Sequence, residues 1–256
     1  MKTMLTKAFT IFVFTSLLTI VFGLTGCATY RAAMPADLTD FITGVHGVDP
    51  KAKVDYLPFN QSWTNRAFAL KKYSKLYVAP ISTQYLKPGS WVNSVSPYVA
   101  SEKSYQDEVA KLAEYFHKQI IDELRSYDKN RFQVVAAPEP GALCLELALT
   151  EVVFSHPGAY AGSMASPVPG TSSAVNSSLG SSVAFELRLR DVSRAAVMFT
   201  AADRRTPPAK VVDLNKFAFT SSAREIVQEW AVLFAKFLNL EEHEKVEAKR
   251  FKAKPW

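Results

Sequence analysis

The chain has 256 residues, of which 48% are hydrophobic, 21% are charged and only 10 are glycine. This composition excludes collagen-like, low-complexity and wholly disordered proteins. The formal net charge is +6 and no basic stripe runs through the sequence, so nothing indicates nucleic-acid binding.

The N-terminus has the parts of a bacterial secretion signal. Lys2 and Lys7 precede an apolar run from Ala8 to Leu24, which is shorter than the ~20 residues of a membrane-spanning helix. The run ends in Leu24-Thr25-Gly26-Cys27. These residues resemble the bacterial lipobox, in which a cysteine is joined to diacylglycerol before the signal is removed. We therefore predict a signal peptide at residues 1–26 and lipidation of Cys27. Loss of the two lysines leaves the mature chain with a charge of +4.

The resemblance to a lipobox implies that Cys27 carries a diacylglycerol and an acyl chain. This predicts a stable membrane anchor, because stable anchoring needs two or more chains. The next residue, Ala28, is not the aspartate that retains enteric-type lipoproteins in the inner membrane. Resemblance to those lipoproteins implies a periplasm-facing place at the outer membrane of a bacterial cell envelope. The alternative is an ordinary signal-peptidase site with Cys27 as a thiol. Acylation would leave Cys144 without an intrachain disulfide partner.

Residues 27–74 are predicted to form a lipidated tether that becomes an N-terminal arm packed on the domain. The later part of the arm holds five aromatic residues, which a free linker would expose to water: Tyr56, Phe59, Trp63, Phe68 and Tyr73. A single domain is expected over 75–240. The charged tail, 241–256, is expected to fray or to extend the last helix.

The first half of that domain has a strand–helix–strand pattern. The apolar run Lys75–Ile81 predicts a buried strand, and apolar residues at three- and four-residue spacing predict a helix over 101–127, capped by Ser104 with Asp107. A second strand is expected over 132–136. A crossover of this length indicates that the two strands are parallel.

The second half predicts three longer strands and another helix. Residues 143–154 and 183–190 alternate between apolar and polar side chains, and a turn leads from the second of these runs into a partner strand at 195–202. A wide apolar stripe over 220–240, opened by a Ser222–Glu225 capping box, predicts the second helix. The fold class is therefore α/β (α+β), a mixed β-sheet of about five strands with two main helices packed on it.

Two long connections interrupt this pattern. Residues 155–182 form a loop rich in Ser, Gly and Ala, of about 28 residues where most connections have four to six. Residues 82–100 form the second, which holds Tyr85, Trp91 and Tyr98. A loop as long as the first is expected to be mobile or functional.

Several short sequences together resemble one family, the bacterial lipoproteins of domain of unknown function 3313. They are Lys72–Pro80, Tyr115-Phe116, Val134–Leu143, Ala148–Val152, and Ala184–Leu187 leading to Asp203-Arg204-Arg205. The resemblance implies an α/β domain similar to the N-terminal domain of the Tol-system propeller protein. It carries over no catalytic residue, because the family has no assigned chemistry. The long loop at 155–182 departs from the family pattern.

Sequence motifs give no support for an active site. The four histidines lack metal-ligand spacing to one another or to Cys144: His46, His117, His156 and His243. Nucleophile-elbow, zincin and phosphate-loop patterns do not occur, so we expect no catalytic, cofactor-binding or metal site. Cys144 is expected to be buried as a small hydrophobic residue. Asp203-Arg204-Arg205 is expected to pin a strand end through an ion pair, with anion binding as the alternative.

The leading hypothesis is a membrane-anchored, non-enzymatic binding or assembly module, with a periplasmic protein or further copies of itself as partner and no nucleic acid. Two alternatives stay open. One is an oligomeric structural or pore-like lipoprotein that uses residues 155–182 between protomers or in the membrane. The other is a ligand-binding protein or hydrolase with a site near Asp203 and Arg205.

Overall fold

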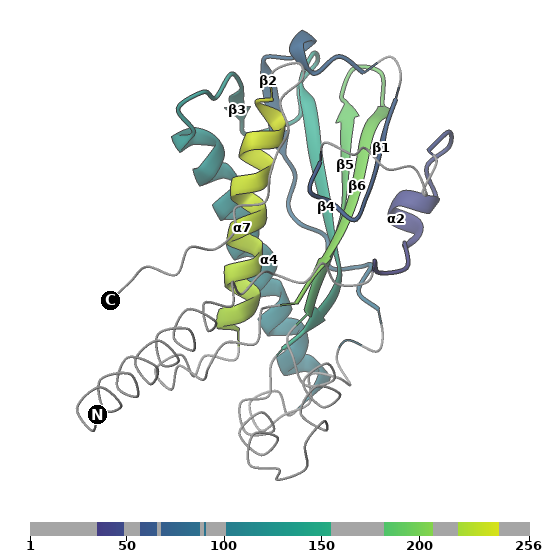
Figure 1. Cartoon of the computed structure of the whole chain (residues 1–256), viewed down its shortest axis with the longest axis vertical. Coiled ribbons are helices and arrows are strands. Elements are labelled where there is room, and N and C mark those ends of the chain that lie inside the picture. Colours follow the sequence, from purple (N-terminus) through teal and green to yellow (C-terminus); the bar gives the residue numbers. More distant parts are fainter. Residues whose placement is uncertain are drawn as a thin grey trace, which may run out of the picture. The chain divides into compact units, whose positions relative to one another are not determined.

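Six strands form one mixed sheet in the computed structural model, in the order β1-β6-β5-β4-β2-β3 (Figure 1). The structure describes residues 35–48, 57–65, 68–87, 90, 101–154, 182–206 and 220–240, all within one unit of the chain. The strands are β1 (Gln61–Thr64), β2 (Lys75–Val78), β3 (Gln133–Val135), β4 (Leu143–Val153), β5 (Ser182–Asp191) and β6 (Ala196–Arg205).

Helices cover both faces of the sheet. The long helices α4 (Glu102–Ser126) and α7 (Ser221–Leu238) lie side by side on one face, and the short helix α2 (Asp40–Thr43) lies on the other (Figure 1). A 3₁₀ helix, η1 (Leu70–Lys72), precedes β2. We call the face under α4 and α7 the inner face and the face under α2 the outer face. Successive residues of each strand point to opposite faces.

The topology confirms the mixed sheet and the two main helices. Strand β2 pairs in parallel with both β3 and β4, so α4 connects the predicted parallel neighbours. Strands β4, β5 and β6 pair antiparallel in sequence order. The sheet has six strands rather than about five, because β1 pairs with β6 where the sequence predicts part of the N-terminal arm. Strand β1 reads Gln-Ser-Trp-Thr, and this short polar run carries no apolar alternation.

Both predicted helix caps are wrong in register. The α4 capping box joins Ser101 and Ser104, since the Ser101 hydroxyl accepts from the Ser104 N–H and the Ser104 hydroxyl from the Ser101 N–H. The box therefore opens three residues before the predicted pair. At α7 the N-cap is Thr220, whose side chain makes no capping hydrogen bond. Thr220 already has helical backbone angles, so the extended conformation that a side-chain cap needs is absent there.

The main hydrophobic core lies between the inner face and the two long helices. Its centre is a group of aromatic rings: the ring of Phe185 lies 4.6 Å from that of Trp230 and 5.2 Å from that of Phe234, edge to face in both pairs. Phe59 contributes a further ring, 5.9 Å from Phe185, and is 2% exposed. Phe59, which lies in the predicted N-terminal arm, is thus part of the main core. Phe68 and Tyr73 also pack against this core.

Several predictions concern segments outside the described residues. They are the signal peptide, the lipidation site at Cys27, the tether before residue 35, residues 155–181 of the long loop, Trp91 and Tyr98, and the tail after 240. Ser182, the last residue of the predicted loop, is the first residue of β5. Within the described ranges no helix is both long and apolar enough to cross a membrane.

Candidate functional site

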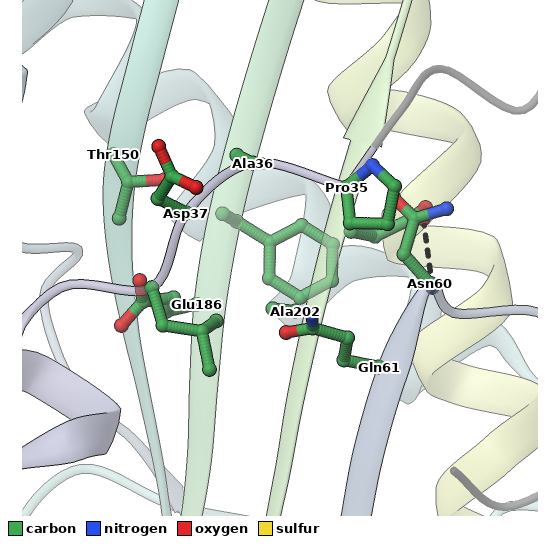
Figure 2. A pocket seen from close by; sticks show the side chains of 11 residues that line it. Pro35, Ala36, Asp37, Asn60, Gln61, Thr150, Glu186 and Ala202 are labelled. Atoms are coloured by element: carbon green, nitrogen blue, oxygen red, sulfur yellow. Dashed lines mark hydrogen bonds between the residues drawn. The ribbon is translucent and has the colours of Figure 1, made fainter. Parts of the chain in front are cut away.

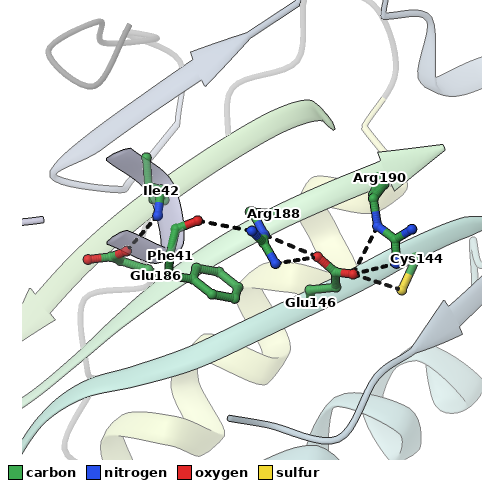
Figure 3. A network of polar contacts seen from close by, with 7 residues as sticks. All are labelled: Phe41, Ile42, Cys144, Glu146, Glu186, Arg188 and Arg190. Carbon is green, nitrogen blue, oxygen red and sulfur yellow. Dashed lines mark hydrogen bonds and ion pairs between the residues drawn. The ribbon is translucent and has the colours of Figure 1, made fainter. Parts of the chain in front are cut away.

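A row of charged side chains follows β4 and β5 along the outer face (Figure 3). Glu146 lies at the centre of this row. Its Oε2 accepts a hydrogen bond from Arg188 Nε at 3.1 Å, and its Oε1 accepts from Arg190 Nε at 2.9 Å and Nη2 at 2.6 Å. Glu146 is paired across the strands with Arg188, so the sheet register places opposite charges side by side. One carboxylate thus binds two guanidinium groups, which leaves the three side chains with a net charge of +1.

Glu186, two residues before Arg188, binds the N-terminus of α2. Its Oε1 accepts from the backbone N–H of Thr39 at 2.6 Å, and its Oε2 accepts from the Thr39 hydroxyl at 2.9 Å and the Ile42 N–H at 3.2 Å. The first N–H groups of a helix have no hydrogen-bond acceptor within the helix. The Glu186 carboxylate, far away in the sequence, supplies an acceptor at the start of α2. Glu186 is 1% exposed. Burial raises the pKa of its carboxyl, and the hydrogen bonds from Thr39 and Ile42 oppose that rise.

Arg188 makes the second attachment to α2. Its Nη1 donates to the carbonyl of Phe41 at 3.1 Å, and its guanidinium carbon lies 3.9 Å from the centre of the Phe41 ring. Phe41 and Ile42 form a small apolar cluster with Ala148 and Ala202, separate from the main core. We call residues 35–48, which carry α2, the docking segment. One helical turn is too short to be stable alone, so the outer face must hold it in place.

A hollow of about 210 Å³ lies where the docking segment crosses the sheet towards β1 (Figure 2). Asp37, Gln61, Thr150 and Glu186 are among the side chains that line it. A second hollow of about 170 Å³ lies beside it, against Trp63. Pockets for small molecules usually have about 300–1,000 Å³. These two spaces are smaller even though their volumes include open solvent, so neither is a candidate site for a small-molecule ligand.

The Asp203-Arg204-Arg205 cluster divides between the two faces. On the inner face Asp203 Oδ2 accepts from Arg205 Nε at 2.9 Å and from Trp230 Nε1 at 2.8 Å. Arg205 Nη1 also lies 3.0 Å from Glu229 Oε2 on α7. On the outer face Arg204 pairs with Glu151 at 2.8 Å. The predicted ion pair at the strand end is confirmed, and it also ties β6 to α7.

This inner cluster is buried. Asp203 and Arg205 are only 5% and 7% exposed. Burial raises the pKa of the Asp203 carboxyl, and the charge of Arg205 opposes the rise. The second oxygen of Asp203 accepts from the Asn60 N–H at 3.2 Å (Figure 2). Both oxygens of Asp203 thus have partners within the chain.

Cys144 is buried, as the sequence predicts. It is 2% exposed, has no disulfide partner among the described residues, and lies with its Sγ 3.9 Å from Glu146 Oε1. Burial, together with the nearby charge of Glu146, raises the pKa of its thiol to about 11. At neutral pH the thiol is therefore protonated and a poor nucleophile.

Of the four histidines, the structure describes two. His46 is exposed on the docking segment, and His117 Nε2 lies 3.1 Å from the carbonyl oxygen of Val78. His156 and His243 fall outside the described ranges. In the described part of the chain no group of three His, Cys, Asp or Glu residues could hold a metal ion.

The family model for the protein of unknown function DUF3313 matches residues 53–234. The chain belongs to this family. The matched region contains Glu146, Glu186 and Arg188 of the outer face and the whole Asp203–Arg205 cluster. The docking segment at 35–48 lies before it. A comparison with curated proteins finds no match.

Solved structures with partial likeness come from several bacteria. PelC from Paraburkholderia phytofirmans, solved as a dodecamer, is 16% identical, with 71% of this chain and 96% of that chain covered and a TM-score of 0.37. Protein XCC0632 from Xanthomonas campestris, of family DUF330, is 11% identical, with coverages of 68% and 87% and a TM-score of 0.39. The hypothetical protein CT253 from Chlamydia trachomatis is 9% identical, with coverages of 64% and 91% and a TM-score of 0.31.

Sequence reasoning missed the outer-face site itself. It placed Glu146, Glu186, Arg188 and Arg190 on the polar side of two strands but assigned them no contact. A usable signal was present, because opposite charges on adjacent antiparallel strands favour cross-strand pairs. The docking of Thr39 and Phe41 on these residues had no such signal, since a four-residue helix has no periodicity to detect.

Proposed function

We propose that this chain is a bacterial envelope lipoprotein, anchored through Cys27, whose domain acts as a binding or assembly module and not as an enzyme. The sequence Leu24-Thr25-Gly26-Cys27 carries the proposal. A secretion signal that ends in a lipobox-like sequence supports export followed by acylation. The alanine after the cysteine favours sorting to the outer membrane, with the domain facing the periplasm.

The described charged clusters support a scaffold more than a catalyst. Glu186 binds the docking segment, Glu146 binds two arginines, and Asp203 binds Arg205 and Trp230. A general acid or base must reach the proton of a substrate, whereas these carboxylates are engaged by their own chain. The likeness to the N-terminal domain of the Tol-system propeller protein stays a prediction.

The anchor is tested by expressing the full-length chain in a Gram-negative bacterium with an alkyne-bearing fatty acid. In the chain without substitutions we expect the acyl label and an N-terminus that begins at the acylated Cys27. The same result is expected in Cys144→Ser, the matched control. Cys27→Ser should lose the label and leave the membrane fraction. Label that persists in Cys27→Ser, or an unmodified Cys27 in the mature protein, would contradict the proposal.

The native mass of the acylated protein in mild detergent separates the module from the structural alternative. The mass of one chain is expected for a module that recruits a partner, and crosslinking would then identify that partner. A closed ring of defined size would instead favour the oligomeric role and direct attention to residues 155–182. The soluble Cys27→Ser form is the control for association that depends on the lipid.

A further inference from the structure

We propose that the docking segment is a detachable strap that sets how far the domain can stand from its anchor. Docked on the outer face, residues 35–48 hold the domain near the membrane. Released, they become part of a longer tether. The effect on reach rests on the lipid anchor of the proposed function, whereas docking and release are properties of the folded chain alone.

The difference in reach follows from chain length. Pro35, the first described residue of the docking segment, lies eight residues after Cys27. An extended chain covers at most about 3.6 Å per residue, so Pro35 on the docked domain can lie at most about 29 Å from Cys27. With the segment released, the body begins at Leu57, thirty residues after Cys27, and the limit rises to about 108 Å. Release therefore extends the reach nearly fourfold.

The packing of the segment makes it separable from the domain. Phe41 and Ile42 belong to the small outer cluster, whereas the main core is built from residue 57 onwards. Two open hollows flank the segment against β1 and β6. The family match begins at residue 53, after the segment has ended. Elements with few buried apolar contacts are the ones that open without global unfolding.

The attachment combines the burial of Phe41 and Ile42 in the small outer cluster with a few polar contacts at two side chains of the sheet. Glu186 accepts three hydrogen bonds from the first turn of α2, and Arg188 donates one to Phe41 and stacks on its ring. Both side chains belong to β5, so the sheet keeps the attachment site in place when the segment leaves. Arg188 also keeps its bonds to Glu146 after release.

Hydrogen exchange measured by mass spectrometry on the soluble Cys27→Ser chain tests docking without the lipid. Amides of residues 39–45 should exchange at least tenfold faster than those of β5. In Glu186→Gln they should exchange at least tenfold faster again, because the NH₂ group of glutamine replaces an oxygen that accepts hydrogen bonds from Thr39 and Ile42. The matched control is Glu151→Gln, a second outer-face carboxylate that binds Arg204 and Ser182 instead of the segment. It should leave segment exchange unchanged.

The inference fails if the amides of the segment exchange as slowly as those of the inner core. It also fails if Glu186→Gln and Glu151→Gln accelerate the exchange of the segment equally. Should Glu186→Gln fail to fold, Phe41→Ala removes the other half of the attachment from the segment side. It should accelerate exchange of the segment while β5 stays protected. Loss of protection in both places would equally overturn the idea of a separable strap.

Reach is tested with the acylated chain in vesicles of phosphatidylethanolamine and phosphatidylglycerol that contain an acceptor dye. The donor dye is placed on Lys129→Cys, an exposed position in the turn after α4. Energy transfer should fall in Glu186→Gln and stay unchanged in Glu151→Gln. If Glu186→Gln and Glu151→Gln gave equal energy transfer while Glu186→Gln accelerated exchange of the segment, the effect on reach would be refuted. Failure of the anchor is a distinct result, since the chain would then not bind the vesicles while the exchange results stand.

Discussion

The two faces of the sheet are built from alternate residues of the same strands, yet they hold their covering elements by different forces. On β5, Phe185 and Leu187 face the long helices, and Glu186 and Arg188 between and beside them face the docking segment. Large apolar side chains contribute about 1.5–3 kcal/mol each when buried. A hydrogen bond contributes only about 0.5–1.5 kcal/mol net. The outer face buries only two large side chains of its covering element, Phe41 and Ile42, whereas the inner face buries the whole main core. The inner face therefore carries the fold, and the outer face carries an element that can leave.

The strongest test of this contrast is Phe185→Ala. The Phe185 ring contacts Trp230, Phe234 and Phe59, so its removal leaves a cavity at the centre of the core. We expect the free energy of unfolding to fall by about 3–5 kcal/mol, measured by denaturant titration of the soluble Cys27→Ser chain. A loss below about 1 kcal/mol would show that the inner face does not carry the fold.

A comparable loss is expected for Arg205→Ala. This change leaves Asp203 buried without its cation and removes the partner of Glu229, and breaking a buried ion pair typically costs about 3–5 kcal/mol. Arg204→Ala is the matched control on the outer face, where the pair with Glu151 is more exposed than the Arg205–Asp203 pair and its loss should cost less. Equal losses in the two variants would remove the distinction between the faces at this end of β6.

An intermediate, local effect is expected for Phe41→Ala. The ring stacks on Arg188 and meets Tyr85 edge to face at 5.2 Å, but it does not belong to the main core. We expect proteolysis within residues 35–48 to become at least several-fold faster, while the global unfolding midpoint changes little. A fall in global stability as large as that of Phe185→Ala would mean that the segment and the domain unfold together.

The contrast also explains what the sequence could predict. The alternation in β4 and β5 and the apolar stripes of α4 and α7 are repeated over many residues, so these four elements and the inner core between them could be predicted. The partner of Glu186 was not predictable, because Thr39 lies 147 residues away and its four-residue helix has no pattern of its own. Strand β1 was missed for the same reason, since only its pairing with β6 makes it a strand. Short elements that depend on tertiary contacts leave little trace in one sequence.

The smallest effect of releasing the docking segment is expected on the reactivity of Cys144, which also lies on the outer face. Its buried thiol, with a pKa of about 11, should react with iodoacetamide at pH 8 far more slowly than after denaturation, in the Cys27→Ser chain where it is the only thiol. Reaction of the native thiolate should rise about tenfold from pH 8 to pH 9, whereas an ordinary thiol with a pKa near 8.5 would gain about threefold. Phe41→Ala should leave the rate unchanged, because the polar partners of the Cys144 thiol are Glu146 and Arg190 on the sheet. A faster reaction in that variant would extend the influence of the docking segment along the whole outer face.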